Sequence, residues 1–239
     1  MLLERRRRPI RGVRIVHKSP TPGDLDPIRA QIIPYRRLED AEVERVLTML
    51  ATSDDVTSGQ IVTSALATSE QEAFRNAGFV DREALHLLRH RLIDIPTQRE
   101  PQHRTRPGRR SDLGAILSID HDSFDSFWTF DRESLNAARK ATPTNRYRVA
   151  LVDGIVAGYA ISGRAGRASF LQRLGVAPVH RGKGIGTQLV KDALDWAKAE
   201  GATSMLVNTQ TTNVNALRLY ESLDFVLSSD QLTVLQLTQ

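Results

Sequence analysis

The sequence predicts a mixed α/β fold of the α+β class, preceded by a smaller, related lobe near the N-terminus. Three observations support this prediction. Helix and strand patterns alternate from about residue 107 onward, which is typical of layered folds. A glycine-rich segment at residues 181–186 lies between a strand pattern and a helix pattern. Residues 55–80 align without gaps with residues 201–226, which indicates a partial internal repeat.

The spacing of apolar side chains predicts each C-terminal element. Residues 187–200 place Leu189, Ala193 and Ala197 on one helical face, and Gly201 ends the helix. Asp153 and Gly154 form a hairpin-turn dipeptide between two strand patterns. The other expected elements are helices at 112–124 and 213–223 and strands at 148–151, 155–161, 168–176, 205–208, 225–227 and 232–237.

Composition limits the class of protein. The chain has 239 residues, of which 40% are hydrophobic, and it has no cysteine. This length allows one or two domains. The lack of cysteine excludes disulfides, thiolate metal sites and a cysteine nucleophile. No apolar run approaches the ~18 residues of a membrane span, and no secretory signal follows Met1. We therefore expect a cytoplasmic protein that does not enter a membrane.

Basic residues and prolines suggest how the chain is divided. The net charge is +5, and Arg5–Arg8 begin a basic N-terminal segment. Such a run either contacts an anionic partner or forms a solvated tail. The polar segment at residues 95–103 contains two prolines, which is typical of a linker. The expected division is a basic tail at 1–18, a lobe at 19–94, a linker at 95–105 and a C-terminal domain at 106–239.

The glycine-rich segment has the properties of a phosphate-binding loop. Its glycines allow close approach of a ligand to backbone N–H groups, and the helix N-terminus that follows favours an anion. Arg181 and Lys183 add positive charge. Neither a P-loop nor a dinucleotide-binding fingerprint is present, because the glycine spacing fits neither motif. The alternative is a solvent-exposed glycine-rich turn.

This segment resembles the pyrophosphate-binding motif R/Q-x-x-G-x-G/A of the GNAT superfamily of N-acetyltransferases, with Arg181, Gly184 and Gly186 in place. Residues 171–178 are similar to the strand that precedes the motif, and residues 106–120 resemble the opening strand and helix. Residues 213–225 resemble the later signature N-x-x-A-x-x-L-Y-E-x-x-G-F. The resemblance implies a GNAT-like central mixed sheet flanked by helices.

The resemblance also implies the reaction and its site. The family transfers acetyl from acetyl-CoA, without a metal, to a primary amine that attacks it directly; the amine belongs to a protein N-terminus, a lysine or a small molecule. Tyr220 is the expected catalytic residue, which protonates the departing CoA thiolate; its alternative role is packing. Asn213 either contacts the cofactor or caps a helix. The expected cofactor-binding residues are Leu174, Val176, Arg181, Gly182, Lys183, Gly184, Ile185, Gly186, Thr187 and Asn213.

Two departures from the family pattern concern the chemistry. Asp224 stands where the signature has glycine, and Asp tolerates a positive φ better than most residues. No Asp or Glu lies between Asp153 and Asp192, so the central strand lacks the carboxylate base of many relatives. The base is then water, the backbone or a group from elsewhere, such as Asp120, His121, Asp122 or Asp125. Residues 123–130 resemble a loop that covers the acceptor, or they pack the core.

The N-terminal lobe is interpreted as a degenerate, truncated GNAT-like lobe with a structural role. In the internal alignment Asn213 corresponds to Ala67 and Tyr220 to Phe74. Glu39 and Asp40 lie where phosphate would bind and would repel it. We therefore expect no cofactor site in this lobe. His86 and His90 lie in a Leu-rich, strand-like run without a third ligand, so no metal site is expected.

Three functions remain open from the sequence. The first is an enzyme that acetylates an amine. The second is an acetyl-CoA-binding regulatory or scaffold protein with little turnover, which the missing strand carboxylate favours. The third is a nucleic-acid- or ribosome-associated protein located by Arg5–Arg8.

Overall fold

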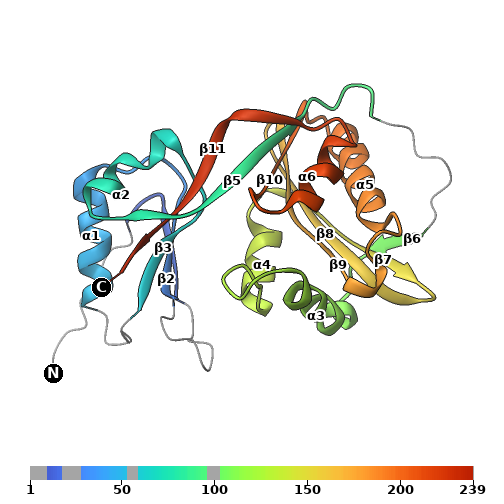
Figure 1. Cartoon of the computed structure of the whole chain (residues 1–239), viewed down its shortest axis with the longest axis horizontal. Helices are drawn as coiled ribbons and strands as arrows, with labels where there is room; N and C mark the ends of the chain where they lie inside the picture. The colour runs from blue at the N-terminus through green and yellow to red at the C-terminus, as the bar shows by residue number, and fades with distance from the viewer. Residues whose placement is uncertain (1–9, 18–27, 53–58, 96–102, 239) are drawn as a thin grey trace. The chain divides into compact units, whose positions relative to one another are not determined.

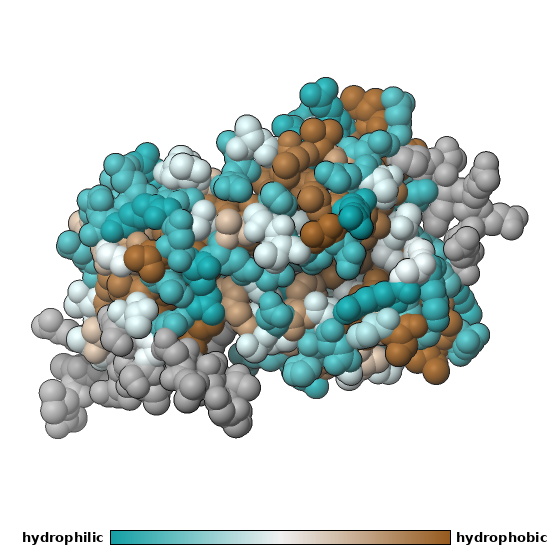
Figure 2. All heavy atoms as spheres, in the orientation of Figure 1, coloured by the Kyte–Doolittle hydropathy of each residue, from teal (hydrophilic) through white to brown (hydrophobic). Residues whose placement is uncertain are grey.

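The structure, a computed structural model, describes residues 10–17, 28–52, 59–95 and 103–238. Arg5–Arg8 and most of the expected linker therefore lie outside the described residues. The chain divides into two compact units, one of residues 1–86 with 229–239 and one of residues 87–228. Within the described ranges no helix is long and apolar enough to cross a membrane. Hydrophilic side chains occupy much of the face seen in Figure 2.

The N-terminal unit is a sheet with two helices. Its strand order is β1-β2-β3-β11, and β4 also pairs with β11. Strands β2 and β3 are parallel, and the other neighbours are antiparallel. Leu38, Val43, Val46, Ile61 and Phe74 contribute to its buried core. The elements are β1 (Val13–His17), β2 (Ile28–Pro34), α1 (Asp40–Ala51), β3 (Gln60–Thr63), β4 (Leu66–Ala67), a 3-10 turn (Thr68–Glu70), α2 (Glu72–Asn76) and the start of β5 (Val80–His90).

The division into units differs from the one expected at residues 95–105. Strand β11 (Val226–Leu237) is a single strand rather than two, and it ends in the N-terminal unit, where Gln236 pairs with Val62. Strand β5 begins in that unit and ends in the other, where Leu88 is buried. Leu235 of β11 is thus buried in the N-terminal core, and Leu88 of β5 is buried in the C-terminal core. The expected tail at 1–18 also differs, because residues 13–17 form β1.

Leu235 tests whether the C-terminal strand stabilises the N-terminal unit. Its side chain is 0% exposed among the core residues of that unit. Leu235→Ala is expected to lower the free energy of unfolding by about 2–5 kcal/mol, because it removes buried methyl groups and leaves a cavity. Urea unfolding followed by hydrogen exchange at β3 measures this loss. Leu227→Ala on the same strand is the control, since Leu227 is 46% exposed. Equal losses in the two variants would contradict the assignment.

The C-terminal unit contains a mixed sheet with helices on both faces (Figure 1). Its strand order is β5-β10-β9-β8-β7-β6. Strands β9 and β10 are parallel, whereas β9-β8, β8-β7 and β7-β6 are antiparallel. This confirms the expected mixed fold. The elements are β6 (Arg104–Pro107), a 3-10 turn (Arg110–Asp112), α3 (Leu113–Ser123), α4 (Arg132–Lys140), β7 (Thr144–Val152), β8 (Ile155–Ala165), β9 (Ala168–Val176), a 3-10 turn (Pro178–His180), α5 (Ile185–Ala199), β10 (Ser204–Gln210) and α6 (Val214–Glu221).

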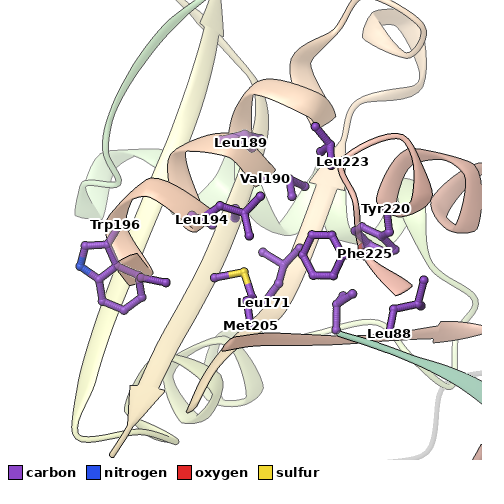
Figure 3. Packing of buried hydrophobic residues seen from close by; sticks show 14 of the residues in the cluster. Leu88, Leu171, Leu189, Val190, Leu194, Trp196, Met205, Tyr220, Leu223 and Phe225 are labelled. Carbon is purple, nitrogen blue, oxygen red and sulfur yellow. The ribbon is translucent and has the colours of Figure 1, made fainter. Parts of the chain in front are cut away.

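Two hydrophobic clusters cover the two faces of this sheet. One packs α5 and α6 against the sheet and includes Leu189, Leu171 and Tyr220 (Figure 3). The other packs α3 and α4 against the sheet and includes Ile119 and Tyr159. Adjacent side chains on a strand point to opposite faces, so β7 and β8 supply both clusters, with Ala150 and Ala160 in the first and Val149 and Tyr159 in the second. The sheet is therefore buried on both sides in this unit.

His90 makes the stability of the C-terminal unit depend on pH. Its side chain is 1% exposed, and its Nδ1 accepts a hydrogen bond from the Leu92 N–H at 2.8 Å. Nε2 therefore carries the proton of the neutral ring, and it is buried without a hydrogen-bond partner. Burial lowers the pKa of His90 below 6.5, and the charge of Asp224 opposes this only in part.

Stability is expected to fall as the pH drops below about 6.5. The unfolded state then binds a proton that the folded His90 does not, so protons favour unfolding with a slope of up to about 1.4 kcal/mol per pH unit. Thermal unfolding between pH 7.5 and 5.5 measures the slope. His90→Leu should reduce it, whereas His86→Leu on the same strand should not. An identical slope in wild type and His90→Leu would reject this account.

Candidate functional site

The two parallel strands β9 and β10 separate halfway along their length. Pairing runs from Ser204 opposite Ala168 to Leu206 opposite Phe170. Strand β9 nevertheless continues to Val176, and β10 continues to Gln210. The backbone of β9 beyond Phe170 thus pairs with β8 on one side and has no paired residue of β10 on the other; this unpaired stretch between β9 and β10 is called the opening. Leu174 and Val176, which are among the expected cofactor-binding residues, lie on this unpaired stretch of β9.

A β-bulge in β9 lies at the start of this opening. Ile161 pairs with Arg173 and Ser162 pairs with Leu171, so Gln172 is an extra residue. A bulge changes the face to which the following side chains point. Leu171 packs with the α5–α6 cluster, whereas Arg173 contacts Asp120 of α3. The bulge therefore turns Arg173 toward the α3–α4 face.

The glycine loop has the backbone expected of an anion-binding turn. Gly182 and Gly184 have φ values of +74° and +78°. These values lie in the left-handed region, which residues with a Cβ rarely adopt. Gly184 is the N-cap of α5. The N–H groups of Ile185, Gly186 and Thr187 lie in the first turn, where an α-helix offers unsatisfied donors. The Ile185 side chain is only 1% exposed, so its backbone is the part that could bind a ligand.

The two charged side chains of this loop, Arg181 and Lys183, differ in their contacts. The guanidinium of Arg181 donates hydrogen bonds to the carbonyls of Val176, at 3.3 Å, and Asp122, at 3.1 Å. Arg181 thus links the loop to the end of α3, while Lys183 is exposed. The backbone N–H of His103 donates to Gln188 on α5 at 3.0 Å, and its Nε2 lies 2.7 Å from the Lys183 carbonyl oxygen. These contacts of His103 were not predicted from the sequence, because no local pattern connects His103 with α5.

Asn213 is the N-cap of α6, and Tyr220 lies within this helix. The Asn213 side chain accepts a hydrogen bond from the Ala216 N–H at 3.1 Å, so its expected N-cap role is confirmed. Tyr220 is 5% exposed in the core, and its ring centroid is 5.6 Å from that of Phe225. Burial raises the pKa of Tyr220 above its usual value. The phenol is therefore protonated at neutral pH, which is the state a proton donor requires.

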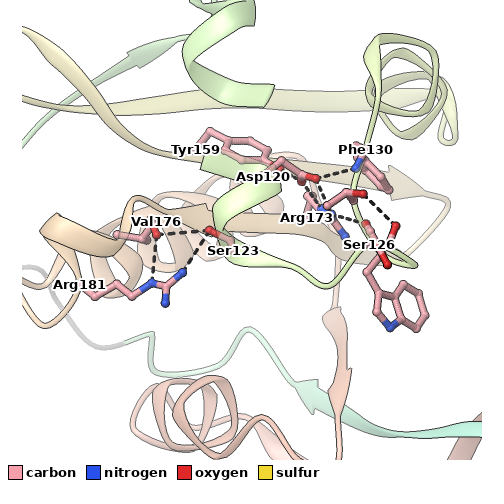
Figure 4. Close-up of polar contacts among 10 residues, drawn as sticks. Asp120, Ser123, Ser126, Phe130, Tyr159, Arg173, Val176 and Arg181 are labelled. Atoms are coloured by element: carbon pink, nitrogen blue, oxygen red, sulfur yellow. Dashed lines mark hydrogen bonds and ion pairs between the residues drawn. The ribbon is translucent and has the colours of Figure 1, made fainter. Parts of the chain in front are cut away.

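Asp120 is buried and fully engaged, which changes its expected role. Its carboxylate accepts from Arg173 at 2.7 and 2.9 Å, from the Phe130 N–H at 2.6 Å and from the Tyr159 hydroxyl (Figure 4). A carboxylate with both oxygens so bound is not free to accept a proton from a substrate. Asp120 is therefore a poor candidate for the base, while His121 and Asp122 are exposed at the end of α3.

The N-terminal unit has carboxylates at the N-terminus of α1, the helix terminus at which phosphate was expected from the sequence to be repelled. Glu42 on the first turn of α1 accepts from Arg36 at 2.6 and 2.9 Å and from the Glu39 N–H at 3.2 Å. The hydrogen bond from Arg36 lowers the pKa of Glu42 to about 2, so the group is ionised at neutral pH. A pocket beside it is lined by Arg37, Leu38, Glu39, Asp40, Ala41, Glu72, Ala73 and Asn76. This acidic environment disfavours phosphate.

Metal ligands are not grouped in the part of the chain that the structure describes. No cluster of three or more His, Cys, Asp or Glu side chains suited to a metal ion is found there. The glycine loop at the N-terminus of α5 and the unpaired edge of β9 could together hold an extended ligand with an anionic group. The opening, the glycine loop and Tyr220 come together from β9, α5 and α6 of the same unit.

Known proteins resemble this chain in both sequence and fold. Residues 113–225 match the acetyltransferase (GNAT) family. The N-alpha-acetyltransferase RimI of Mycobacterium tuberculosis is 35% identical over 89 residues, which are 36% of this chain and 54% of that protein. N-alpha-acetyltransferase 30 of Xenopus laevis is 44% identical over 61 residues, 25% of this chain and 22% of that protein. This chain thus aligns with about half or less of each relative's length.

A solved structure shows the same fold. The GCN5-related N-acetyltransferase from Kribbella flavida has a TM-score of 0.62 and 16% sequence identity, over 87% of this chain and 80% of that chain. The matched 87% of this chain is longer than the C-terminal unit, residues 87–228, so the similarity of fold extends into the N-terminal unit. At this identity the comparison concerns the fold alone.

Proposed function

Because residues 113–225 are a GNAT acetyltransferase domain, we propose that the chain transfers acetyl from acetyl-CoA to a primary amine. The observation that carries the proposal is the glycine loop at the N-terminus of α5 beside the unpaired end of β9. The loop offers N–H donors and a helix terminus for the pyrophosphate. The open edge of β9 offers backbone partners for the pantetheine arm.

The reaction is a direct transfer. The amine lone pair attacks the thioester carbonyl, the bond between carbon and sulfur breaks, and the amine loses a proton. Tyr220 is the proposed donor of a proton to the departing CoA thiolate, and its burial keeps the phenol protonated beforehand. The proton from the amine goes to water, since Asp120 is already bound by Arg173 and Tyr159.

An α-amino group is the proposed acceptor. An N-terminal amine has a pKa of about 8 and is roughly 10% neutral at pH 7, whereas a lysine with a pKa of about 10.4 is neutral to less than about 0.1%. Since Asp120 is already bound by Arg173 and Tyr159, the acceptor that needs least help from a base is the amine that is already neutral. Two relatives that act as N-alpha-acetyltransferases agree with this choice.

Release of CoA in the presence of defined amines tests the proposal. A thiol reagent reads CoA alone, because the chain has no cysteine. Peptides with free N-termini should be acetylated, with a mass increase on the α-amine, and the same peptides with blocked N-termini should not. Acetyl-CoA binding without turnover on any peptide, lysine or small amine would instead support the regulatory or scaffold alternative.

A further inference from the structure

The loop between α3 and α4, residues 124–131, is attached to β9 through one side chain. The guanidinium of Arg173 lies over the rings of Phe124 and Phe130, 3.4 and 3.9 Å from their centroids. It also donates a hydrogen bond to the Trp128 carbonyl at 2.5 Å. Arg173 therefore contacts the loop at its beginning, middle and end.

The same loop is attached to Asp120. The Phe130 N–H donates to Asp120 Oδ1 at 2.6 Å, while Arg173 binds both carboxylate oxygens. The Asp120 and Arg173 side chains are only 0% and 7% exposed. A buried carboxylate left without its cation is strongly disfavoured, so the two residues hold the loop as a unit (Figure 4).

The loop lies on the face of the sheet from which an acceptor must come. Helices α5 and α6 cover one face and the cofactor loop leads into α5, while α3 and its loop lie on the other. The thioester would reach the second face through the opening between β9 and β10. Arg173 follows the bulge at that opening, and Ser123 donates to the carbonyl of Val176 at 3.4 Å. The loop thus borders the end of the opening.

We propose that Asp120 and Arg173 are positioning residues that fix the α3–α4 loop as a wall of the amine-acceptor subsite. The role of the loop rests on the proposed function, whereas its attachment can be measured separately. The ion pair with Asp120 neutralises the guanidinium of Arg173, so Arg173 adds no net charge beneath the aromatic rings of the loop. This positioning role gives Arg173 a function on the strand where many relatives carry a carboxylate.

Hydrogen exchange measures the attachment directly on the full chain. Asp120→Asn keeps the shape of the side chain but removes the charge that binds Arg173. The Phe130 amide and its neighbours in the loop should exchange at least tenfold faster in this variant. Arg173→Lys keeps a positive charge but loses the paired hydrogen bonds and the bond to Trp128, so it should act in the same direction. Arg173→Lys also decides the question if Asp120→Asn does not fold.

The same domain provides a matched control. Asp112 forms a second paired Arg–Asp contact, with Arg106 at 2.6 and 2.8 Å, and also accepts from the Arg109 N–H at 2.7 Å. It precedes α3, far along the helix from the loop. Asp112→Asn removes comparable interactions and should lower the thermal midpoint, yet leave loop exchange unchanged. A general loss of stability would affect both variants alike.

Kinetics test the positional role. With a peptide bearing a free N-terminal alanine as the probe, Asp120→Asn should raise the KM for the peptide at least fivefold and leave the KM for acetyl-CoA unchanged. If the loop amides exchanged equally fast in Asp120→Asn and Asp112→Asn, the claim that Asp120 and Arg173 hold the loop would be overturned. Equal changes in both KM values would overturn the acceptor role. A wild-type protein that acetylates no amine would reject the proposed function and the acceptor role, while the exchange result would still decide the attachment.

Discussion

Replacing Tyr220 by Phe should lower the rate of CoA release by about 10²-fold or more and leave acetyl-CoA affinity unchanged. General acid catalysis contributes an effect of this size. Burial keeps the Tyr220 phenol protonated, and Phe retains the ring that packs against Phe225 at 5.6 Å. The variant thus removes the hydroxyl and little else. Measurement of kcat together with the dissociation constant of acetyl-CoA separates chemistry from binding.

Tyr147 is the matched control for this variant. It is a partly buried tyrosine on β7 of the same unit, and burial raises its pKa to about 12. Its ring lies 4.5 Å from the Arg139 guanidinium, away from α6. Tyr147→Phe should retain the wild-type kcat. If Tyr220→Phe retained it as well, Tyr220 would be a packing residue only.

Gly184→Glu should abolish the stabilisation by acetyl-CoA. The backbone at Gly184 has φ +78°, which strains any residue with a side chain, and a carboxylate at the N-terminus of α5 would repel a pyrophosphate. A ligand at about 100-fold its Kd stabilises by about 2.7 kcal/mol. For a protein of this size the midpoint should rise by roughly 5–10 °C in wild type and should not move in the variant.

Gly201→Glu controls for backbone strain. Gly201 has φ +81° in the turn after α5, and a Cβ there meets nothing within 4 Å. This variant introduces the same side chain with similar strain but away from the loop. It should lose stability without ligand, yet keep the full midpoint rise with acetyl-CoA. A rise in Gly184→Glu equal to that of Gly201→Glu would show that the pyrophosphate does not bind this loop.

Much of the C-terminal unit could be predicted because its signals are local. Residues 187–200 correspond to α5 at Ile185–Ala199, since apolar spacing and Gly201 define that helix. Asp153 and Gly154 have φ values of +50° and +80°, as their hairpin turn requires. Asp224 has φ +62°, the conformation expected where the family signature has glycine.

The Asp120–Arg173 contact could not be predicted, because it depends on two non-local features. The residues are 53 positions apart, and no periodic pattern connects them. Strict alternation would place Arg173 on the same face as Leu171. The bulge at Gln172 reverses this, and a single sequence offers no sign of it.

The division into two units could not be predicted from the sequence either. Strands β5 and β11 carry apolar residues near both of their ends, and such a pattern does not reveal which of the two units each residue belongs to. The polar, proline-containing segment after β5 was the stronger local signal, yet β5 had already entered the C-terminal unit. The proposal that the N-terminal lobe binds no CoA rests instead on charge, since Glu42 already occupies the first turn of α1.

Isothermal titration of the full chain with acetyl-CoA tests the central claim most directly, that one cofactor site lies in the C-terminal unit. The account predicts binding with one molecule per chain, and loss of that binding in Gly184→Glu. Two molecules per chain would show that the N-terminal lobe retains a site despite its carboxylates. No binding at saturating ligand would contradict the proposed transferase function.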